Sequence, residues 1–161
     1  MRWFILNSNI KKLLICIAIP LVIGALAAFL TKDSMAAFQL LNKPVLSPPG
    51  ILFPIVWTIL YTLMGIASYL VINSENGKEY IDDAIFFYGL QLAVNFFWSI
   101  FFFNFGWYFF SFLWLVLLWL LILVTIVLFG KISKPAAYLL LPYLLWVTFA
   151  GYLNYSIYLL N

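Results

Sequence analysis

Residues 44–65 read PVLSPPGILFPIVWTILYTLMG and contain the change that decides the fold, from a proline-rich loop to a membrane-spanning helix. Each proline fixes its own φ and favours extended backbone at the residue before it, so the loop cannot be helical throughout. Pro54 falls in the first helical turn, where a missing N–H costs little. Phe53, Trp57 and Tyr61 recur at i, i+4 and i+8, which places three aromatic rings on one helix face. The stretch therefore predicts an apolar site beneath a stiff loop.

The composition is that of an integral membrane protein. Of 161 residues, 67% are hydrophobic and only 8% are charged, whereas about a quarter of a soluble domain is charged. The net charge of +3 is small, so we expect no nucleic-acid partner. The chain has no His, and Cys16 is its one Cys. We therefore expect no intramolecular disulfide, no metal site and no covalently bound cofactor.

Continuous apolar runs predict an all-α bundle of five transmembrane helices, in a single domain that covers residues 1–161. At 1.5 Å per residue, even the run at residues 13–30 is about 27 Å long, enough to cross a bilayer. The runs do not alternate between apolar and polar residues, which disfavours β-strands. The predicted spans are residues 13–30, 51–72, 84–103, 107–129 and 136–159, and residues 31–50 form a lid-like first loop.

Five spans place the two termini on opposite sides of the membrane. The amino-terminal segment and the second and fourth loops carry six basic residues, and the other side carries two. The positive-inside rule then predicts a cytoplasmic amino terminus and an external first loop, in the cell membrane. The alternative is a secretory signal cleaved after residues 25–27, which is disfavoured because the apolar run continues to Leu30.

The predicted spans contain amide side chains but no Asp, Glu, Lys or Arg, which disfavours a pump or an ion-coupled transporter. Gln91 and Asn95 lie in the third span, and Asn154 lies in the fifth. An amide in hydrocarbon needs a hydrogen-bond partner. Two interpretations stay open: these amides join helices to one another, or they provide polar contacts inside a ligand cavity.

Helical phase separates two faces of the third span. Gln91, Asn95 and Trp98 fall at i, i+4 and i+7, whereas Gly89 and Ala93 form a small-xxx-small pair about 200° away, at about 100° per residue. The first face is predicted to point at polar and aromatic partners. The second face permits close approach of another helix, which belongs either to a second subunit, giving a homodimer, or to the same bundle.

The fifth span repeats this pattern, because Trp146, Ala150, Leu153 and Asn154 share one stripe. The small side chain of Ala150, one turn from Trp146, leaves room beside the indole. Trp57 and Trp146 lie too deep for the interfacial belt, where tryptophan sits at the level of the headgroups. We therefore expect both to belong to a pocket in the outer half of the bundle, rather than to simple core packing.

Three blocks of sequence carry a family resemblance. Residues 43–69 read KPVLSPPGILFPIVWTILYTLMGIASY, residues 91–98 read QLAVNFFW, and residues 142–154 read PYLLWVTFAGYLN. With its five spans, the chain resembles the translocator protein family (TspO/MBR, tryptophan-rich sensory protein, peripheral-type benzodiazepine receptor) over nearly its whole length. The resemblance implies a five-helix bundle, often a homodimer, with one cavity under the first loop. The family binds porphyrins, sterols and synthetic isoquinoline carboxamide or benzodiazepine-type ligands.

The resemblance also implies a photochemical activity. Bacterial members are linked to light-dependent oxidative breakdown of protoporphyrin IX, and the two tryptophans associated with that reaction match Trp57 and Trp146, which become the candidate catalytic residues. The animal members end in a cholesterol-recognition pattern with a basic residue, which this chain lacks. The candidate ligand-binding residues are Pro44, Phe53, Trp57, Tyr61, Gln91, Asn95, Trp98, Trp146, Ala150 and Leu153.

Alternatives to a porphyrin-binding sensor remain. One is a passive transporter of porphyrin or a sterol-like lipid, and another is a non-catalytic membrane binding or assembly protein. The spans contain no acid–base pair, nucleophile or metal-ligand cluster, so hydrolytic or acyl-transfer chemistry has no support.

Overall fold

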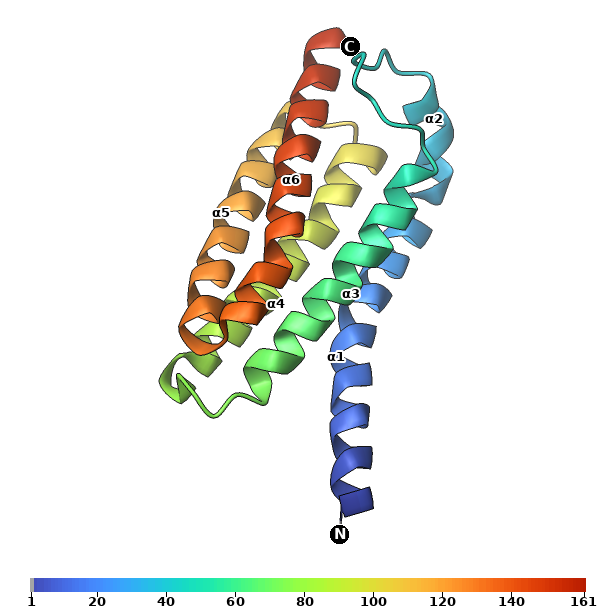
Figure 1. Cartoon of the computed structure of the whole chain (residues 1–161). Coiled ribbons are helices and arrows are strands. Elements are labelled where there is room, and N and C mark those ends of the chain that lie inside the picture. The colour runs from blue at the N-terminus through green and yellow to red at the C-terminus, as the bar shows by residue number, and fades with distance from the viewer. Residues whose placement is uncertain (1) are drawn as a thin grey trace.

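A computed structural model describes residues 2–161, and their side chains from residue 9 onward (Figure 1). Five helices are long and apolar enough to cross a membrane, and the described residues contain no strand. The five-helix prediction is thus confirmed. The first helix begins earlier than its predicted span, because the basic lead is helical as well. The five helices are α1 (Arg2–Thr31), α3 (Leu52–Ile72), α4 (Ile81–Ser99), α5 (Tyr108–Ile132) and α6 (Lys134–Leu160).

Short elements occupy the connections. The lid-like first loop is partly helical, while its proline-rich part is not, as predicted, and contains a turn in which the Ser47 N–H donates to the Pro44 carbonyl over 2.9 Å. Gly77 and Gly106 turn the chain at the second and third loops with φ of 60° and 65°, values that favour glycine because it lacks a Cβ. The short elements are η1 (Lys32–Ser34), α2 (Met35–Gln39), η2 (Lys78–Tyr80) and η3 (Ile100–Asn104).

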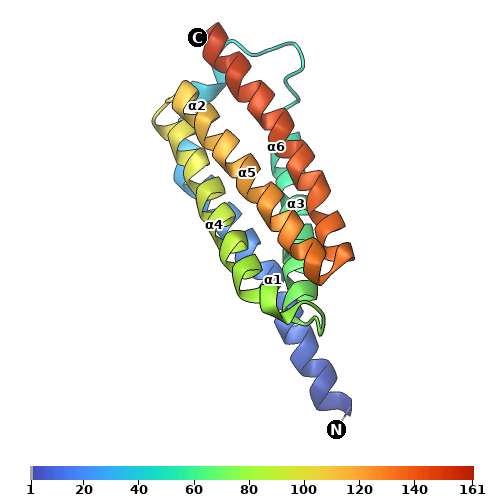
Figure 2. The ribbon, with the colours of Figure 1, turned by 90° about the vertical axis from the view of Figure 1, so that its left-hand side faces the viewer.

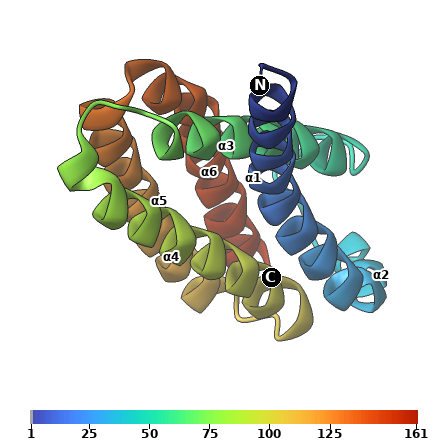
Figure 3. The ribbon, with the colours of Figure 1, turned by 90° about the horizontal axis from the view of Figure 1, so that it is seen from below.

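The helices follow one another around the bundle in the order α1, α3, α6, α5, α4, and α4 returns to α1. Figure 2 shows α4, α5 and α6 side by side, and Figure 3 shows the arrangement from below. The amino and carboxyl termini lie at opposite ends of the bundle (Figure 1), as an odd number of spans requires. The sidedness of the membrane stays a prediction.

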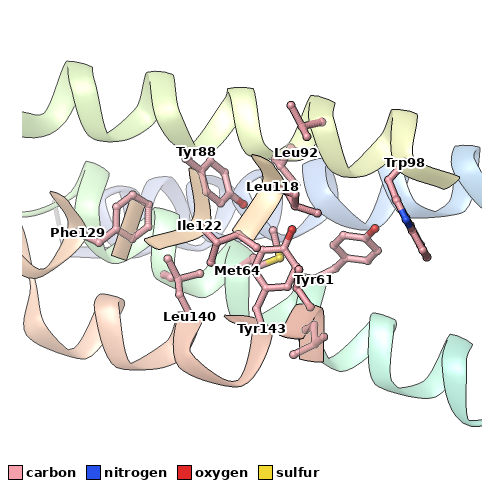
Figure 4. Close-up of a cluster of buried hydrophobic side chains, with 14 of the residues drawn as sticks. Tyr61, Met64, Tyr88, Leu92, Trp98, Leu118, Ile122, Phe129, Leu140 and Tyr143 are labelled. Carbon is pink, nitrogen blue, oxygen red and sulfur yellow. The ribbon is translucent and has the colours of Figure 1, made fainter. Parts of the chain in front are cut away.

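One end of the bundle, where α3 meets α4 and α5 meets α6, is filled by a dense core (Figure 4). Met64 and Leu118 have no exposed surface, and Ile122, Phe129 and Tyr143 expose at most 1%. At this end α1 and α3 approach so closely that a Cβ on Gly65 would lie 2.4 Å from the Ile17 Cα atom. We call this half of the molecule the packed end.

Charged groups lie outside the packed core. In the part of the chain with described side chains, the one ion pair joins Lys78 to Glu75 in the exposed loop between α3 and α4. The hydrogen bond donated by Lys78, together with its positive charge, lowers the pKa of Glu75 below its usual value. The outer surface of the helices is instead rich in exposed Leu, Ile, Val and Phe, which suits contact with lipid.

Candidate functional site

A cavity of about 800 Å³ lies at the other end of the bundle, under the first loop. Ligand pockets commonly measure roughly 300–1,000 Å³ and are mostly apolar, so its size suits an organic molecule. We call this half of the molecule the cavity end. Its walls come from α1, α2, α3, α6 and the end of α4 with η3. The aromatic members of the wall are Phe38, Phe53, Trp57, Tyr61, Trp98, Phe102 and Phe103.

The aromatic face predicted for α3 lines this cavity along its whole length. Phe53, Trp57 and Tyr61 all border the space, because their spacing keeps them on one side of the helix. The rings of Trp57 and Tyr61 stack at 5.2 Å between centroids, with 29° between their planes. Tyr143 meets Trp57 edge-on at 6.1 Å. Stacking and edge contacts hold the indole of Trp57 in place at the boundary between the cavity and the packed end.

At each of its three positions, the predicted polar face of α4 makes one hydrogen bond across the bundle, to α6 or α3. Gln91 accepts from the Tyr143 hydroxyl at 2.8 Å, and the Asn95 amide donates to the Tyr61 hydroxyl at 3.1 Å. Neither amide lines the cavity. Both take the helix-joining role that the sequence left open, and Asn95 acts on the cavity through the ring of Tyr61.

Trp98 completes the α4 face and does line the cavity. Its indole N–H donates to the Asn154 carbonyl oxygen at 3.1 Å, and the Asn154 amide donates to the Tyr108 main-chain oxygen at 2.7 Å. This chain of bonds ties α4, α6 and the start of α5 together beneath the first loop. The wall opposite α3 is therefore fixed by the amide of Asn154, and most of the side chains on its surface are apolar.

The α6 stripe divides between the cavity and the layer behind it. Ala150, Leu153 and Asn154 line the cavity. Trp146 does not. Its ring packs edge-on against Phe53 at 5.9 Å between centroids, so Phe53 stands between the cavity and this tryptophan. The Trp146 indole nitrogen is buried and has no hydrogen-bond partner in the described structure, which leaves a donor free next to the site.

The first loop contributes less than its proline pattern suggested. Pro44 does not border the cavity, whereas Lys43 and Ser47 do. The loop is fastened to the end of α6, because the Asn42 N–H donates to Asn161 Oδ1 at 3.0 Å and Asn161 Nδ2 donates to the Asn42 carbonyl at 3.1 Å. The loop is thus held over the cavity by an amide latch, Asn42–Asn161, that the sequence pattern did not reveal.

Sequence reasoning also missed the wall that α1 provides. Leu21, Gly24, Ala25 and Ala28 of this helix all line the cavity. The pair Gly24 and Ala28 has small-xxx-small spacing, which predicts close packing. Gly24 does pack closely, against the Tyr61 ring, but Ala28 is exposed and borders the cavity.

The second face of α4 points away from the bundle. Gly89 and Ala93 are exposed, and a Cβ on Gly89 would meet nothing within 4 Å. The alternative in which this face packs inside its own bundle is therefore wrong. Phe86 and Phe97 flank the small pair and are 64% and 46% exposed, so the face is free for lipid or a second subunit.

The cavity offers stacking surfaces and hydrogen bonds rather than acid–base or metal chemistry. No group of His, Cys, Asp or Glu side chains that could hold a metal ion occurs among the described residues. The charged side chain at its rim is Lys43, whose ammonium lies 4.7 Å from the centre of the Phe38 ring. The site therefore suits a large, mostly apolar molecule with aromatic rings that can stack on its walls.

Comparison with known proteins assigns the family. The model of the TspO/MBR family matches residues 16–160. The chain is 39% identical to the tryptophan-rich protein TspO of Chlorobaculum tepidum over 97% of this chain and 99% of that protein. It is also 39% identical to the tryptophan-rich protein TspO of Archaeoglobus fulgidus (95% and 99% coverage) and 33% identical to the translocator protein of Bos taurus (87% and 84% coverage). The chain therefore belongs to the TspO/MBR family.

Proposed function

We propose that this integral membrane protein binds porphyrin, with protoporphyrin IX as the reference ligand, in the cavity under its first loop. The observation that supports this most is the pairing of a space of about 800 Å³ with an aromatic wall. Synthetic isoquinoline carboxamide or benzodiazepine-type ligands, which are also flat and apolar, would compete for the same space. The densely packed side chains of the packed end leave no path for a porphyrin below the cavity. The structure of this end therefore favours a binding or sensing protein over a transporter that moves the ligand through the bundle.

In this proposal the ligand stacks on the aromatic wall. Trp57 of α3 and Trp98 of α4 both border the space and offer indole surface, while the smaller Ala150 and Leu153 of α6 leave room for the ligand. Asn95 keeps Tyr61 oriented through its hydrogen bond. Lys43 has two interpretations: it pairs with the propionates of the porphyrin, or it simply extends its charge to the interface while its stem covers apolar surface.

We propose further that the bound porphyrin is degraded oxidatively in light, with dioxygen as oxidant. In the net reaction one methine C=C bond and the O–O bond break and two C=O bonds form, so atoms and electrons balance. Indole is readily oxidised, and Trp57 exchanges one electron with the excited porphyrin and recovers it in the same turnover. Trp146 exchanges an electron with the porphyrin less directly, because the ring of Phe53 lies between Trp146 and the cavity.

We also propose a homodimer, located in the cell membrane. The exposed face around Gly89 and Ala93 is our candidate for a homodimer contact, since small residues let helices approach closely. We place the protein in the cell membrane with its amino terminus in the cytoplasm, which puts the cavity in the outer half of the bilayer.

The test is a titration of protoporphyrin IX into purified protein in detergent, followed by illumination. Tryptophan fluorescence reports binding, and the Soret band reports loss of the porphyrin. We expect saturable quenching and then bleaching that a Trp57→Phe/Trp146→Phe variant slows. Trp119→Phe is the matched control, because Trp119 does not line the cavity and its indole N–H donates a hydrogen bond to the Thr148 hydroxyl.

The outcomes separate the candidate functions. Saturable binding with bleaching that is equal in all variants would overturn the photochemical role and leave a binding or transport protein. Absence of saturable binding would overturn the proposal as a whole and favour a structural or assembly role.

A further inference from the structure

The exposed lining of the cavity lies on one side of the bundle. Its lining residues from α4, η3 and α6 are buried or half-buried, whereas every lining residue classed as exposed lies on α1, α2, the first loop or α3. Ala25 and Ala28 of α1 and Pro54 and Thr58 of α3 belong to this exposed set. The cavity therefore meets its surroundings between α1 and α3, and also along α2 and the first loop, where the other exposed lining residues lie.

The lower limit of this opening is set by contact between the two helices. α1 and α3 are in backbone contact at Ile17 and Gly65, and Gly24 lies so close to Tyr61 that a Cβ would meet its ring at 2.2 Å. Continuing this antiparallel register toward the first loop brings Ala25 opposite Thr58 and Ala28 opposite Pro54. There the side chains are small, and the space between the helices belongs to the cavity.

The edges of the opening have the chemistry of a lipid-facing surface. The Thr58 hydroxyl donates to the Pro54 carbonyl of its own helix at 2.7 Å, so it presents no free donor. Ala25 and Thr58 lie about six residues from the ends of their helices, or roughly 9 Å below the membrane surface. This depth falls within the hydrocarbon region rather than in water.

The end that faces water also has exposed lining residues, but hydrogen bonds fasten its segments to one another. The Asn42–Asn161 latch holds the first loop to α6. Lys43 lies over Phe38 at the rim. Ser34 donates to Asn104 Oδ1 at 2.7 Å, and Asn104 Nδ2 donates to the Leu30 carbonyl at 3.1 Å, which joins the end of α1 to the turn after α4.

We propose that ligands reach the cavity sideways from the bilayer, through a slot between α1 and α3 whose width is set by Ala25 and Ala28. This inference rests on the proposed binding function and adds its ligand class: flat molecules that partition into the membrane. The small side chains of the slot select ligands by thickness, and water-soluble molecules that do not enter lipid are excluded.

The test uses full-length protein in phosphatidylcholine vesicles and protoporphyrin IX as the probe. Stopped-flow quenching of tryptophan gives the association rate, and transfer to excess empty vesicles gives the dissociation rate. In Ala25→Leu/Ala28→Leu both rates should fall by about tenfold, as a raised barrier of about 1.4 kcal/mol requires. A lost ligand contact, in contrast, raises the dissociation rate.

Two further variants make the result specific. Ala18→Leu adds the same bulk to an exposed position one heptad below Ala25, outside the cavity, and should leave both rates unchanged. Asn42→Ala removes the latch and should change the association rate by less than about twofold, because ligands do not pass under the loop. Faster association in Asn42→Ala together with wild-type rates in the slot variant would overturn the lateral route. Lack of saturable quenching in wild-type protein would instead overturn the proposed function.

Discussion

The two ends of the bundle use small residues in opposite ways. At the packed end Gly65 lets the backbones of α1 and α3 touch, and Met64 beside it is fully buried. At the cavity end Ala28 and Ala150 face a space of about 800 Å³ instead of a neighbouring helix. A small residue therefore lets two helices pack closely where they run side by side. Where the two helices diverge, the same kind of residue leaves space for a cavity.

The largest expected effect is at Gly65. A Gly65→Ala substitution places a Cβ 2.4 Å from the Ile17 Cα atom, and backbone cannot move aside cheaply, so we expect a loss of roughly 1–3 kcal/mol in unfolding free energy. Unfolding in detergent by heat or denaturant measures this. Gly151→Ala is the matched control, because its Cβ meets nothing within 4 Å, and it should stabilise α6 by about 0.5–1 kcal/mol. Equal stability of the two variants would show that the close approach is absent.

Gly24→Ala should affect ligand binding more than stability. Its Cβ would meet the Tyr61 ring at 2.2 Å, and this ring can shift into the cavity at the expense of the bond from Asn95. We expect a smaller loss of stability than for Gly65→Ala and a fall in porphyrin affinity of about tenfold, or about 1.4 kcal/mol. Fluorescence titration and thermal unfolding on the same preparation separate the two effects. Unchanged affinity would mean that the ring of Tyr61 is not part of the binding surface.

Phe53→Ala should extend the cavity toward Trp146. Phe53 is half-buried at the cavity wall, so its truncation should cost less than the ~3–5 kcal/mol of a fully buried Phe. With the intervening ring removed, illumination in the presence of protoporphyrin IX should oxidise Trp146 faster than in wild-type protein. Mass spectrometry of the tryptophan-containing peptides measures this. An unchanged oxidation rate at Trp146 would remove it from the proposed photochemistry.

The smallest effect is expected at the exposed loop of the packed end. Lys78 lowers the pKa of Glu75, so this pair stabilises the fold above the ordinary pKa of Glu, and the contribution is lost as the pH falls through the lowered value. Because both groups are exposed and screened, Glu75→Gln should lower the melting temperature slightly at neutral pH and not at all in acid. A large effect at neutral pH, or one that persists in acid, would contradict this account.

Much of the fold could be predicted from the sequence, because continuous apolar runs and proline positions are local signals. The stripe of Phe53, Trp57 and Tyr61 followed from helical phase alone, and so did the inward direction of the α4 face. Which partner each amide takes depends on how the helices are ordered around the bundle. Periodicity cannot supply that order, so Gln91 remained equally compatible with a ligand contact.

The cavity end held the features that escaped prediction. The spacing of Gly24 and Ala28 in the α1 wall predicted helix packing rather than a cavity. The Asn42–Asn161 latch joins segments far apart in the chain and has no periodic signal. Trp146 shares a stripe with Ala150, yet it lies behind Phe53 because a ring from α3 fills the place beside it. The helix face on which a residue lies is therefore predictable from sequence, whereas exposure to a cavity depends on what the neighbouring helix contributes.

Filling the cavity with a larger side chain tests most directly whether it holds the porphyrin. Protoporphyrin IX is titrated into wild-type protein, Ala150→Leu and the surface control Ala18→Leu, with melting temperatures measured in parallel. Ala150 lines the cavity and is 7% exposed, so the larger side chain occupies ligand space. We predict an affinity at least about tenfold weaker for Ala150→Leu, with a melting temperature equal to or above that of wild type. Wild-type affinity in a folded Ala150→Leu variant would contradict the account.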